Sequence, residues 1–344
     1  MVNERLMSVL KTRFDLMGHV EAIRRYLLFE KGDFALALME VLDNQESHAG
    51  KSIMAHDLSA VLSSAVRSSN AQHESPERLA ALALVLPEEA GHGCGWDEVA
   101  LSYNLSAPLS YVVPKHTMEK YFAVSRFLLK LKRIEYALHS VWHHQMTGSR
   151  SQLRSEDLLK RRSGAGAPPD RSLAAVRKAA RESTIACSEM IQFFQQVQRY
   201  LSLNVIEGAW AKFLKATSGN SGELGIDLWN AAHSKYIGSI HDVVCGGRDG
   251  GRGFQHSLAS ILGTTAQFIT AVKELNSENA LAARRAAPDA RTGLAEHTAR
   301  VHATATRFRD QVKDILRVMS RTTAGELPFL VVTIDFNEAY TGSG

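Results

Sequence analysis

The chain is poor in cysteine, proline and charge of one sign. It holds three cysteines and eight prolines in 344 residues, and its formal net charge is only +4. Cys94, Cys187 and Cys245 are odd in number and widely spaced, which indicates reduced thiols in a cytosolic protein rather than a disulfide framework. The small net charge does not favour nucleic-acid binding, which requires a strong local excess of basic residues.

Long hydrophobic runs are also absent. No uninterrupted apolar run approaches the roughly 18 residues of a membrane-spanning helix, so no membrane partner is expected. Residues 1–13 carry charges every few positions and lack the apolar core of a signal peptide. With 45% hydrophobic and 22% charged residues, the composition is that of an ordinary globular protein.

The stretch from Trp96 to His144 is the most strongly patterned part of the chain. Val99, Leu101 and Tyr103 alternate with polar or small residues, which predicts a strand with one buried face. After a break at residues 106–108, Leu109–Val113 is predicted to return as a second strand that ends at Pro114. A β-hairpin is therefore expected near residues 97–113.

A helical pattern follows this hairpin. Apolar residues recur at spacings of three and four, which is the seam of a buried helix: Val124, Phe127, Leu131, Ile134, Leu138 and Val141. Leu128, Leu129, Tyr136 and Trp142 add a second apolar face. A helix that is apolar on two sides belongs inside a bundle, so we expect Leu131 and Trp142 to be buried.

The rest of the chain is also mainly helical in pattern. The sequence predicts an all-α fold, a multi-helix bundle with long helices and one small β-hairpin insertion, with a further strand possible only in the tail near Phe329–Ile334. We expect an N-terminal helical bundle over 1–145, a flexible loop over 146–171 that is rich in glycine, serine and proline, and a C-terminal long-helix bundle with a short tail over 172–344. A shorter helix is expected at Glu77–Leu86. Together these parts form one domain.

The sequence offers few groups for catalysis. His139 and His143 have the i, i+4 spacing that can hold zinc, but Ser140 stands where a metalloprotease helix has its glutamate and no third ligand follows. Cys245–Gly253 is rich in glycine but lacks the lysine and hydroxyl residue of a P-loop. No serine lies in a Gly-x-Ser-x-Gly elbow. We therefore predict no enzyme activity, no metal and no cofactor.

A basic strip lies on the predicted central helix. Arg126, Lys130 and Arg133 are spaced four and three apart, so they share one helix face. A solvated face explains this strip, and so does contact with an acidic protein. The sequence leaves both open.

Several of these segments resemble a known family. Trp96-Asp97, Leu101-Ser102-Tyr103, Pro108-Leu109 and Lys132-Arg133-Ile134-Glu135-Tyr136 resemble the C-terminal half of the gamma-tubulin complex component proteins. Similar matches occur at Gly32-Asp33-Phe34, at Ala232-His233 with Lys235-Tyr236-Ile237, and at the tail Thr333–Tyr340. The resemblance runs in order over nearly the whole chain.

The resemblance implies a gamma-tubulin-binding subunit of a microtubule-nucleating complex. Such a subunit is not catalytic; it positions gamma-tubulin, which itself holds GTP, as a template for microtubule assembly. The implied partners are gamma-tubulin and other gamma-tubulin complex component proteins, with no membrane or nucleic acid. The implied location is the cytoplasm and cytoskeleton, at a microtubule-organising centre such as a centrosome or spindle pole. The other half of these proteins, which packs side by side in rings, is expected to be absent here, so the chain is either a fragment of a longer protein or a short family member that needs partners.

Tubulins are acidic, so we expect gamma-tubulin to dock at the hairpin tip and the basic strip. The expected contact residues are Tyr103, Asn104, Pro108, Tyr111, Arg126, Lys130 and Arg133. Two alternatives stay open. One is a helical scaffold for another acidic partner or for nucleic acid, bound by the basic loops at Thr147–Asp170 and Gly246–Gly253. The other is a metal-dependent helical enzyme that uses His139 and His143.

Overall fold

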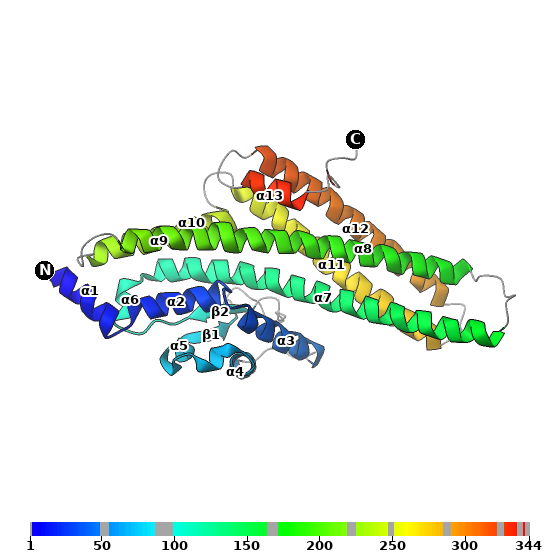
Figure 1. Ribbon diagram of the computed structural model, residues 1–344, viewed down its shortest axis with the longest axis horizontal. Helices are drawn as coiled ribbons and strands as arrows, with labels where there is room; N and C mark the ends of the chain where they lie inside the picture. Colours follow the sequence, from blue (N-terminus) through cyan, green and yellow to red (C-terminus); the bar gives the residue numbers. More distant parts are fainter. Residues whose placement is uncertain are drawn as a thin grey trace. The chain divides into compact units, whose positions relative to one another are not determined.

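The protein is described here from a computed structural model. The described residues are 2–48, 55–86, 99–163, 171–218, 225–246, 251–284, 290–321, 327–335 and 340. Within them the chain is almost entirely helical (Figure 1). The elements are α1 (Val2–Thr12), α2 (Leu16–Leu27), α3 (Gly32–His48), α4 (Ala55–Arg67), η1 (Asn70–His73), α5 (Pro76–Ala81), β1 (Leu82–Val85), β2 (Ala100–Tyr103), α6 (Leu109–Val112), α7 (Lys115–Ser163), α8 (Arg171–Tyr200), η3 (Leu201–Glu207), α9 (Gly208–Thr217), α10 (Ile226–Val244), α11 (Gly251–Arg284), α12 (Ala290–Arg321) and α13 (Leu327–Ile334).

The chain divides into two compact units, each made of two separate stretches of sequence. Unit 1 comprises Met1–Arg133 and Gln198–Gln255, and unit 2 comprises Ile134–Val197 and His256–Gly344. The helices α7, α8 and α11 contribute residues to both units. The domain boundaries predicted from the sequence, around residues 146–171, stay a prediction.

Unit 1 contains one β-sheet among the described residues, a single antiparallel pair of strands. β1 pairs with β2 so that Leu82 lies opposite Tyr103 and Leu84 opposite Leu101. The strand predicted at 99–105 is thus confirmed in β2, but its expected partner is wrong. Leu82 and Leu84 alternate toward the core in a segment that was assigned to a helix over 77–86.

The predicted second strand, Leu109–Val113, is instead the short helix α6. Leu109 and Val112, three positions apart, are both buried, whereas Ser110 and Tyr111 between them are exposed. That spacing places the two apolar side chains on one face of a helical turn, whereas a strand would place them on opposite faces. An apolar run this short does not distinguish the two structures by composition alone.

The long helix predicted after Pro114 is confirmed as α7. Val124, Leu131, Leu138 and Val141 are buried along it, and Trp142 is half-buried rather than fully enclosed. The helix continues to Ser163, so the loop predicted from Thr147 is wrong over most of its length. Residues 152–162 hold strong helix formers and neither glycine nor proline, which explains the continuation. The rest of that predicted loop, residues 164–170, lies outside the described residues.

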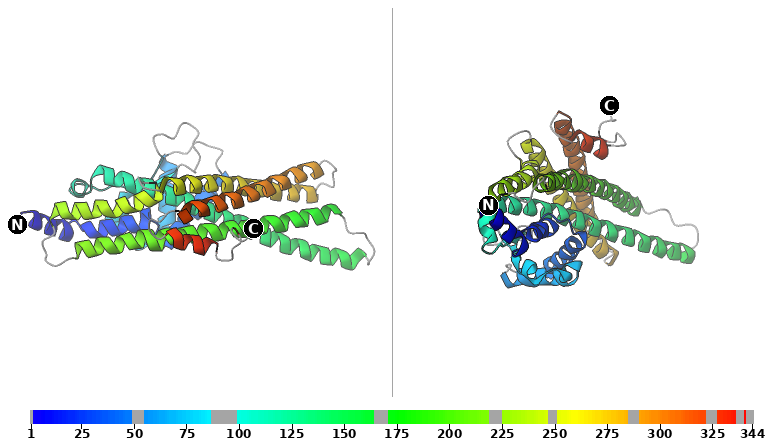
Figure 2. Two further views of the ribbon diagram at one scale, coloured as in Figure 1. Left: turned by 90° about the horizontal axis from the view of Figure 1, so that it is seen from above. Right: turned by 60° about the vertical axis from the view of Figure 1, so that its left-hand side comes forward.

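Unit 2 is built from long helices joined by specific contacts. Between α7 and α8, the Gln145 amide donates to Ser183 Oγ at 2.8 Å. Between α8 and α12, the rings of Phe193 and Phe308 meet edge to face with their centroids 5.7 Å apart. α13 packs on α12, and the two lie side by side in Figures 1 and 2. α13 occupies the region where a tail strand seemed possible, so that expectation is wrong.

The length and the polarity of a helix decide whether it could cross a membrane. Among the described helices, none combines the length and the apolar character that a bilayer crossing requires.

Candidate interaction surface

Tyr103, the first of the predicted contact residues, is part of the core of unit 1. It ends β2, only 3% of its surface is exposed, and its hydroxyl lies 2.7 Å from Nδ1 of His19 on α2. Burial raises the pKa of the Tyr103 hydroxyl, so it stays neutral and joins β2 to α2. Tyr103 positions the segment that follows it and does not offer its ring to a partner.

The next three predicted residues lie in that following segment. Asn104 is exposed, and its backbone N–H donates to the Ala81 carbonyl at 2.7 Å, which fixes the start of the turn. Pro108 is half-buried at the N-terminal end of α6. Tyr111 is 83% exposed, because Leu109 and Val112 occupy the inward face of α6. Tyr111 is therefore presented on a short helix that is anchored to the core.

The predicted basic strip is only partly accessible. Arg126, Lys130 and Arg133 are each half-buried on α7, and each already interacts with other groups of the chain. Arg126 lies 11 residues beyond the start of α7, which is about 16 Å along the helix axis. The strip and Tyr111 therefore do not form one small patch.

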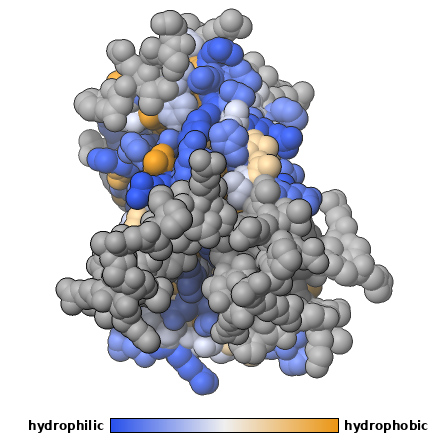
Figure 3. All heavy atoms as spheres, turned by 90° about the vertical axis from the view of Figure 1, so that its right-hand side faces the viewer, coloured by the Kyte–Doolittle hydropathy of each residue, from blue (hydrophilic) through white to orange (hydrophobic). Residues whose placement is uncertain are grey.

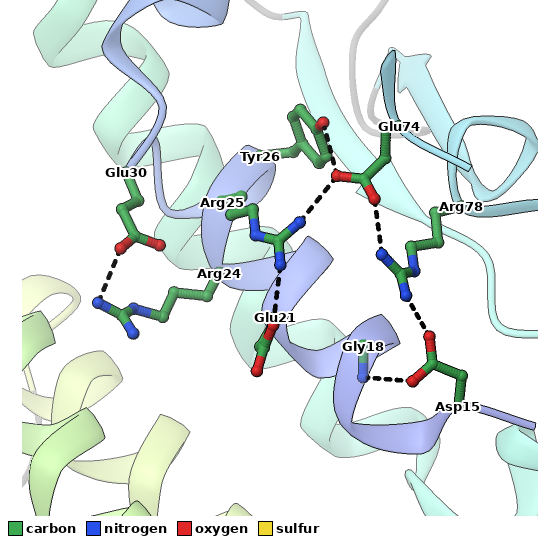
Figure 4. A network of polar contacts seen from close by, with 9 residues as sticks. All are labelled: Asp15, Gly18, Glu21, Arg24, Arg25, Tyr26, Glu30, Glu74 and Arg78. Carbon is green, nitrogen blue, oxygen red and sulfur yellow. Dashed lines mark hydrogen bonds and ion pairs between the residues drawn. The ribbon is translucent and has the colours of Figure 1, made fainter. Parts of the chain in front are cut away.

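A chain of ion pairs fastens the sheet-bearing segment to α2, and it was not predicted from the sequence (Figure 4). Arg78 on α5 bonds to Asp15 at the start of α2 and to Glu74 at 2.6 Å. Arg25 on α2 bonds to Glu74 at 2.8 Å and to Glu21 at 2.8 Å. These residues lie up to 63 positions apart, so no local sequence pattern could have indicated their contact.

Glu74 is the central acceptor of this network. Burial alone would raise the pKa of its carboxyl, but the hydrogen bond from Arg78 and the charges of Arg25 and Arg78 outweigh burial and hold the pKa below its ordinary value. The Tyr26 hydroxyl also donates to Glu74, at 3.2 Å. Glu74 is therefore ionised at neutral pH and balanced by two guanidinium groups.

Arg24, the neighbour of Arg25 on α2, makes a second set of contacts. It pairs with Glu30 at 2.9 Å and with Glu207, the last residue of the π-helical segment η3. Its guanidinium also lies over the ring of Trp210, 4.7 Å from the ring centroid, where a cation–π attraction adds to the ion pairs. Arg24 thus joins α2 to η3 and α9.

An aromatic cluster fills the centre of unit 1. Trp229 stacks on His233 with ring centroids 4.8 Å apart, and Phe213 stacks on Tyr236 at 5.5 Å. The Tyr121 hydroxyl lies 2.9 Å from Nε2 of His233. Burial lowers the pKa of His233 to about 4, so the imidazole is neutral at physiological pH and acts as a core residue.

The residues considered for a metal or phosphate site do not converge on such a site where the structure describes them. His139 and His143 are exposed, and His139 Nε2 lies 3.4 Å from the Gln195 amide nitrogen. Within the part of the chain that the structure describes, no three histidine, cysteine or acidic side chains come together in a metal-binding arrangement. The centre of the glycine-rich segment, residues 247–250, lies outside the described residues, as do Cys94 and Trp96-Asp97.

Comparison with known proteins assigns the chain to a family. The family model described as gamma tubulin complex component C-terminal matches residues 16–340. The chain belongs to this family. The resemblance inferred from the sequence motifs is therefore confirmed, and it extends over both units.

Three relatives illustrate the range of this similarity. The chain is 29% identical to the spindle pole body component alp6 of Schizosaccharomyces pombe over 97% of its own length and 39% of the relative's. It is 33% identical to the gamma-tubulin complex component 3 homolog of Xenopus laevis, over 68% of the chain and 24% of that protein. For human gamma-tubulin complex component 3 the identity is 32%, over 60% of the chain and 21% of that protein. The chain thus spans well under half the length of these relatives.

Proposed function

We propose that this chain is the gamma-tubulin-binding part of a non-catalytic subunit of a microtubule-nucleating complex. The observation that carries the proposal is the family match over residues 16–340, which takes in nearly the whole chain. The relatives are named as components of gamma-tubulin complexes and of the spindle pole body, so the proposed partners are gamma-tubulin and other components of the complex. The proposed location is a microtubule-organising centre in the cytoplasm.

The proposed mechanism is templating. The chain holds one gamma-tubulin in a defined orientation, and neighbouring subunits place several gamma-tubulins at a fixed spacing. Side-by-side packing in the family is attributed to the other half of the longer proteins, and the chain matches only 39% of the length of the fission yeast relative. We therefore infer that this chain alone binds gamma-tubulin one to one and does not assemble rings, because a template requires a multivalent arrangement.

Sedimentation and a nucleation assay test this proposal together. The purified chain is mixed with purified gamma-tubulin, and a one-to-one complex with weak or no microtubule nucleation is expected. The absence of any complex would contradict the gamma-tubulin-binding function. Ring-sized particles with strong nucleation from these two components alone would show that lateral contacts lie within the 344 residues.

The placement of the contact is a separate proposal. Asn104, Pro108 and Tyr111 are supported as contact residues because they follow an anchored strand, and Tyr111 is almost fully exposed. The basic strip has weaker support because its three residues are half-buried and already interact within the chain.

Charge reversal tests the strip. Changing Arg126, Lys130 and Arg133 together to glutamate should weaken gamma-tubulin binding while circular dichroism stays unchanged. The control carries the same change of charge at three exposed arginines of unit 2, Arg181, Arg307 and Arg317. Equal binding by the two triple variants would remove the strip from the contact and leave the family membership untouched.

A further inference from the structure

Four elements that are far apart in the sequence meet at one end of unit 1. Figures 1 and 2 place α1, α6, the end of α9 and the start of α10 at this end. α1 and α9 each pack on α10. Each of these four elements carries at least one large apolar side chain that is exposed. We call the surface made by these residues the end surface: Leu6, Val9, Tyr111, Leu214 and Leu228.

Exposed residues of the end surface lie next to buried core residues in the sequence. Leu228 is 63% exposed, whereas its neighbour Trp229 is completely buried. Leu214 is exposed next to the buried Phe213, in the same way. Because the inward residues fix these helices, the outward residues are held in place before any partner binds, which lowers the entropic cost of association.

The end surface has a basic surround. Among the side chains that the structure describes on these elements and on the adjoining start of α7, the exposed acidic residues are Glu119 and Asp227. The exposed basic residues there are Arg5, Lys11, Lys115, Lys212 and Lys215. An apolar centre with a charged rim is the usual composition of a protein–protein interface. Because this rim is positively charged, it favours a partner whose contact patch has an acidic border.

One other face of the molecule allows a comparison, limited to its coloured residues. On the face in Figure 3, the coloured residues are mainly hydrophilic, and hydrophobic ones are scattered singly. Single exposed apolar residues need no explanation, but a group of them on converging elements indicates an interaction site. A nucleic-acid partner would not require the apolar centre.

We propose that the end surface is the docking site for an acidic folded protein with an apolar contact patch. This inference rests on the proposed function, under which that protein is gamma-tubulin. It moves the centre of the contact from the basic strip of α7 to the end surface, and it keeps Tyr111 from the contact residues predicted above. Tyr111 is the expected anchor, because tyrosines are enriched among the residues that dominate binding energy.

A double substitution tests the site against a matched control. Tyr111→Ser with Leu228→Ser removes two side chains of the end surface. The control, Leu36→Ser with Val332→Ser, removes side chains that are 60% and 62% exposed on α3 and α13. Affinity for purified gamma-tubulin should fall at least about tenfold in the first variant and less than about twofold in the control. Both variants should keep the wild-type melting temperature, since all four residues are exposed.

The rim is tested by kinetics. Lys212→Glu with Lys215→Glu should slow association with gamma-tubulin at low salt more than it speeds dissociation, because rim charges act mainly on the encounter. The slowing should fade as the salt concentration rises.

The outcomes separate this inference from the proposed function. A wild-type chain that does not bind gamma-tubulin overturns the proposed function and this partner with it. A wild-type chain that binds, with equal affinities for the double variant and the control, overturns only the end surface. Binding to phosphatidylserine vesicles that is lost in the double variant, with gamma-tubulin binding unchanged, would replace the protein partner by a membrane and also overturn the inference.

Discussion

The two units differ in how many large hydrophobic side chains they leave exposed among the described residues. Among the described residues, unit 2 exposes few large hydrophobic side chains, namely Ile185, Val318 and Val332. Unit 1 exposes more, namely Leu6, Val9, Phe14, Leu36, Tyr111, Leu203, Leu214 and Leu228. A unit that leaves more apolar surface uncovered is the better candidate for contact with a partner.

The polar contacts of the two units also differ. Unit 1 joins segments that are distant in sequence through networks around Glu74 and Arg24 and through the rings around His233. Unit 2 relies on the seams of long helices, with isolated pairs such as Arg309 and Glu189 between α8 and α12. The stability of unit 1 therefore depends on individual polar and aromatic residues more than the stability of unit 2 does. Unit 1 is for that reason better suited to hold a recognition surface in a defined shape.

The largest expected effect is at the aromatic centre of unit 1. Trp229→Ala should lower the free energy of unfolding by about 3–5 kcal/mol, because it opens a cavity beside His233 and Phe213. The control is Leu228→Ala, one residue earlier and exposed, with an expected change within about 0.5 kcal/mol. Urea denaturation measures both. Similar losses in the two variants would show that the cluster does not hold unit 1 together.

The second largest expected effect comes from one substitution in each unit, both of them on α7. Leu131 and Leu138 are both buried on α7, and they belong to unit 1 and unit 2 respectively. Replacing either by alanine should cost about 2–5 kcal/mol. Hydrogen exchange read by mass spectrometry should show faster exchange mainly in peptides of the unit that was changed. If each substitution loosened both units equally, the division into two units would not describe their stability.

The third effect is a pH dependence that belongs to unit 1. The pKa of His233 is lowered from 6.5 to about 4 in the folded chain, so between these pH values the unfolded state binds more protons than the folded state. Stability is therefore lost as the pH falls from 6.5 toward 4, by an amount on the order of 3 kcal/mol. His233→Gln should lack this part of the acid dependence. Urea midpoints of both proteins across this range measure it, and identical slopes would contradict a buried neutral His233.

The smallest expected effect compares one ion pair from each unit. Glu74→Gln leaves two half-buried guanidinium groups short of a charged acceptor and should cost about 1–3 kcal/mol. Glu189→Gln breaks a pair that is about one-third exposed on both sides and should cost less than about 1 kcal/mol. Thermal unfolding at neutral pH measures both, and a larger loss for Glu189→Gln would reverse the comparison.

Acid provides a further check on Glu74. Its pKa lies below 4.5 in the folded chain, so its contribution is present above pH 4.5 and is lost as the pH falls through the folded pKa. The difference between wild type and Glu74→Gln should therefore shrink in that acidic range. A difference that stayed constant down to pH 3 would show that the network does not depend on an ionised Glu74.

The predictions that succeeded rest on periodicity. The spacing of Val124, Leu131 and Leu138 is a property of neighbouring turns, and it predicted both α7 and its buried face. The alternation around Leu101 predicted β2 in the same way. The predictions that failed concern short runs and partners. Leu109–Val112 is too short for its period to be read, and the pairing of β2 with β1 is a contact between separate segments.

The proposed contact residues also show the difference between local pattern and tertiary contact. The sequence marked Tyr103 and Tyr111 as equal candidates, but only their positions in the fold separate them. β2 turns Tyr103 toward His19, whereas α6 turns Tyr111 outward. No local sequence pattern indicates the ion pairs of Arg24 with Glu207 and of Arg78 with Asp15, because the two members of each pair are 183 and 63 residues apart.

By itself, the sequence determined the helical class, the start and the buried face of α7 and the family, because these depend on periodic burial and on motifs that stand in order along the chain. Only the tertiary structure decided which strand β2 pairs with, how the chain divides into units and which apolar residues remain at the surface. Those features depend on contacts between distant segments, where the free energy comes from packing and charge pairing that no local pattern encodes.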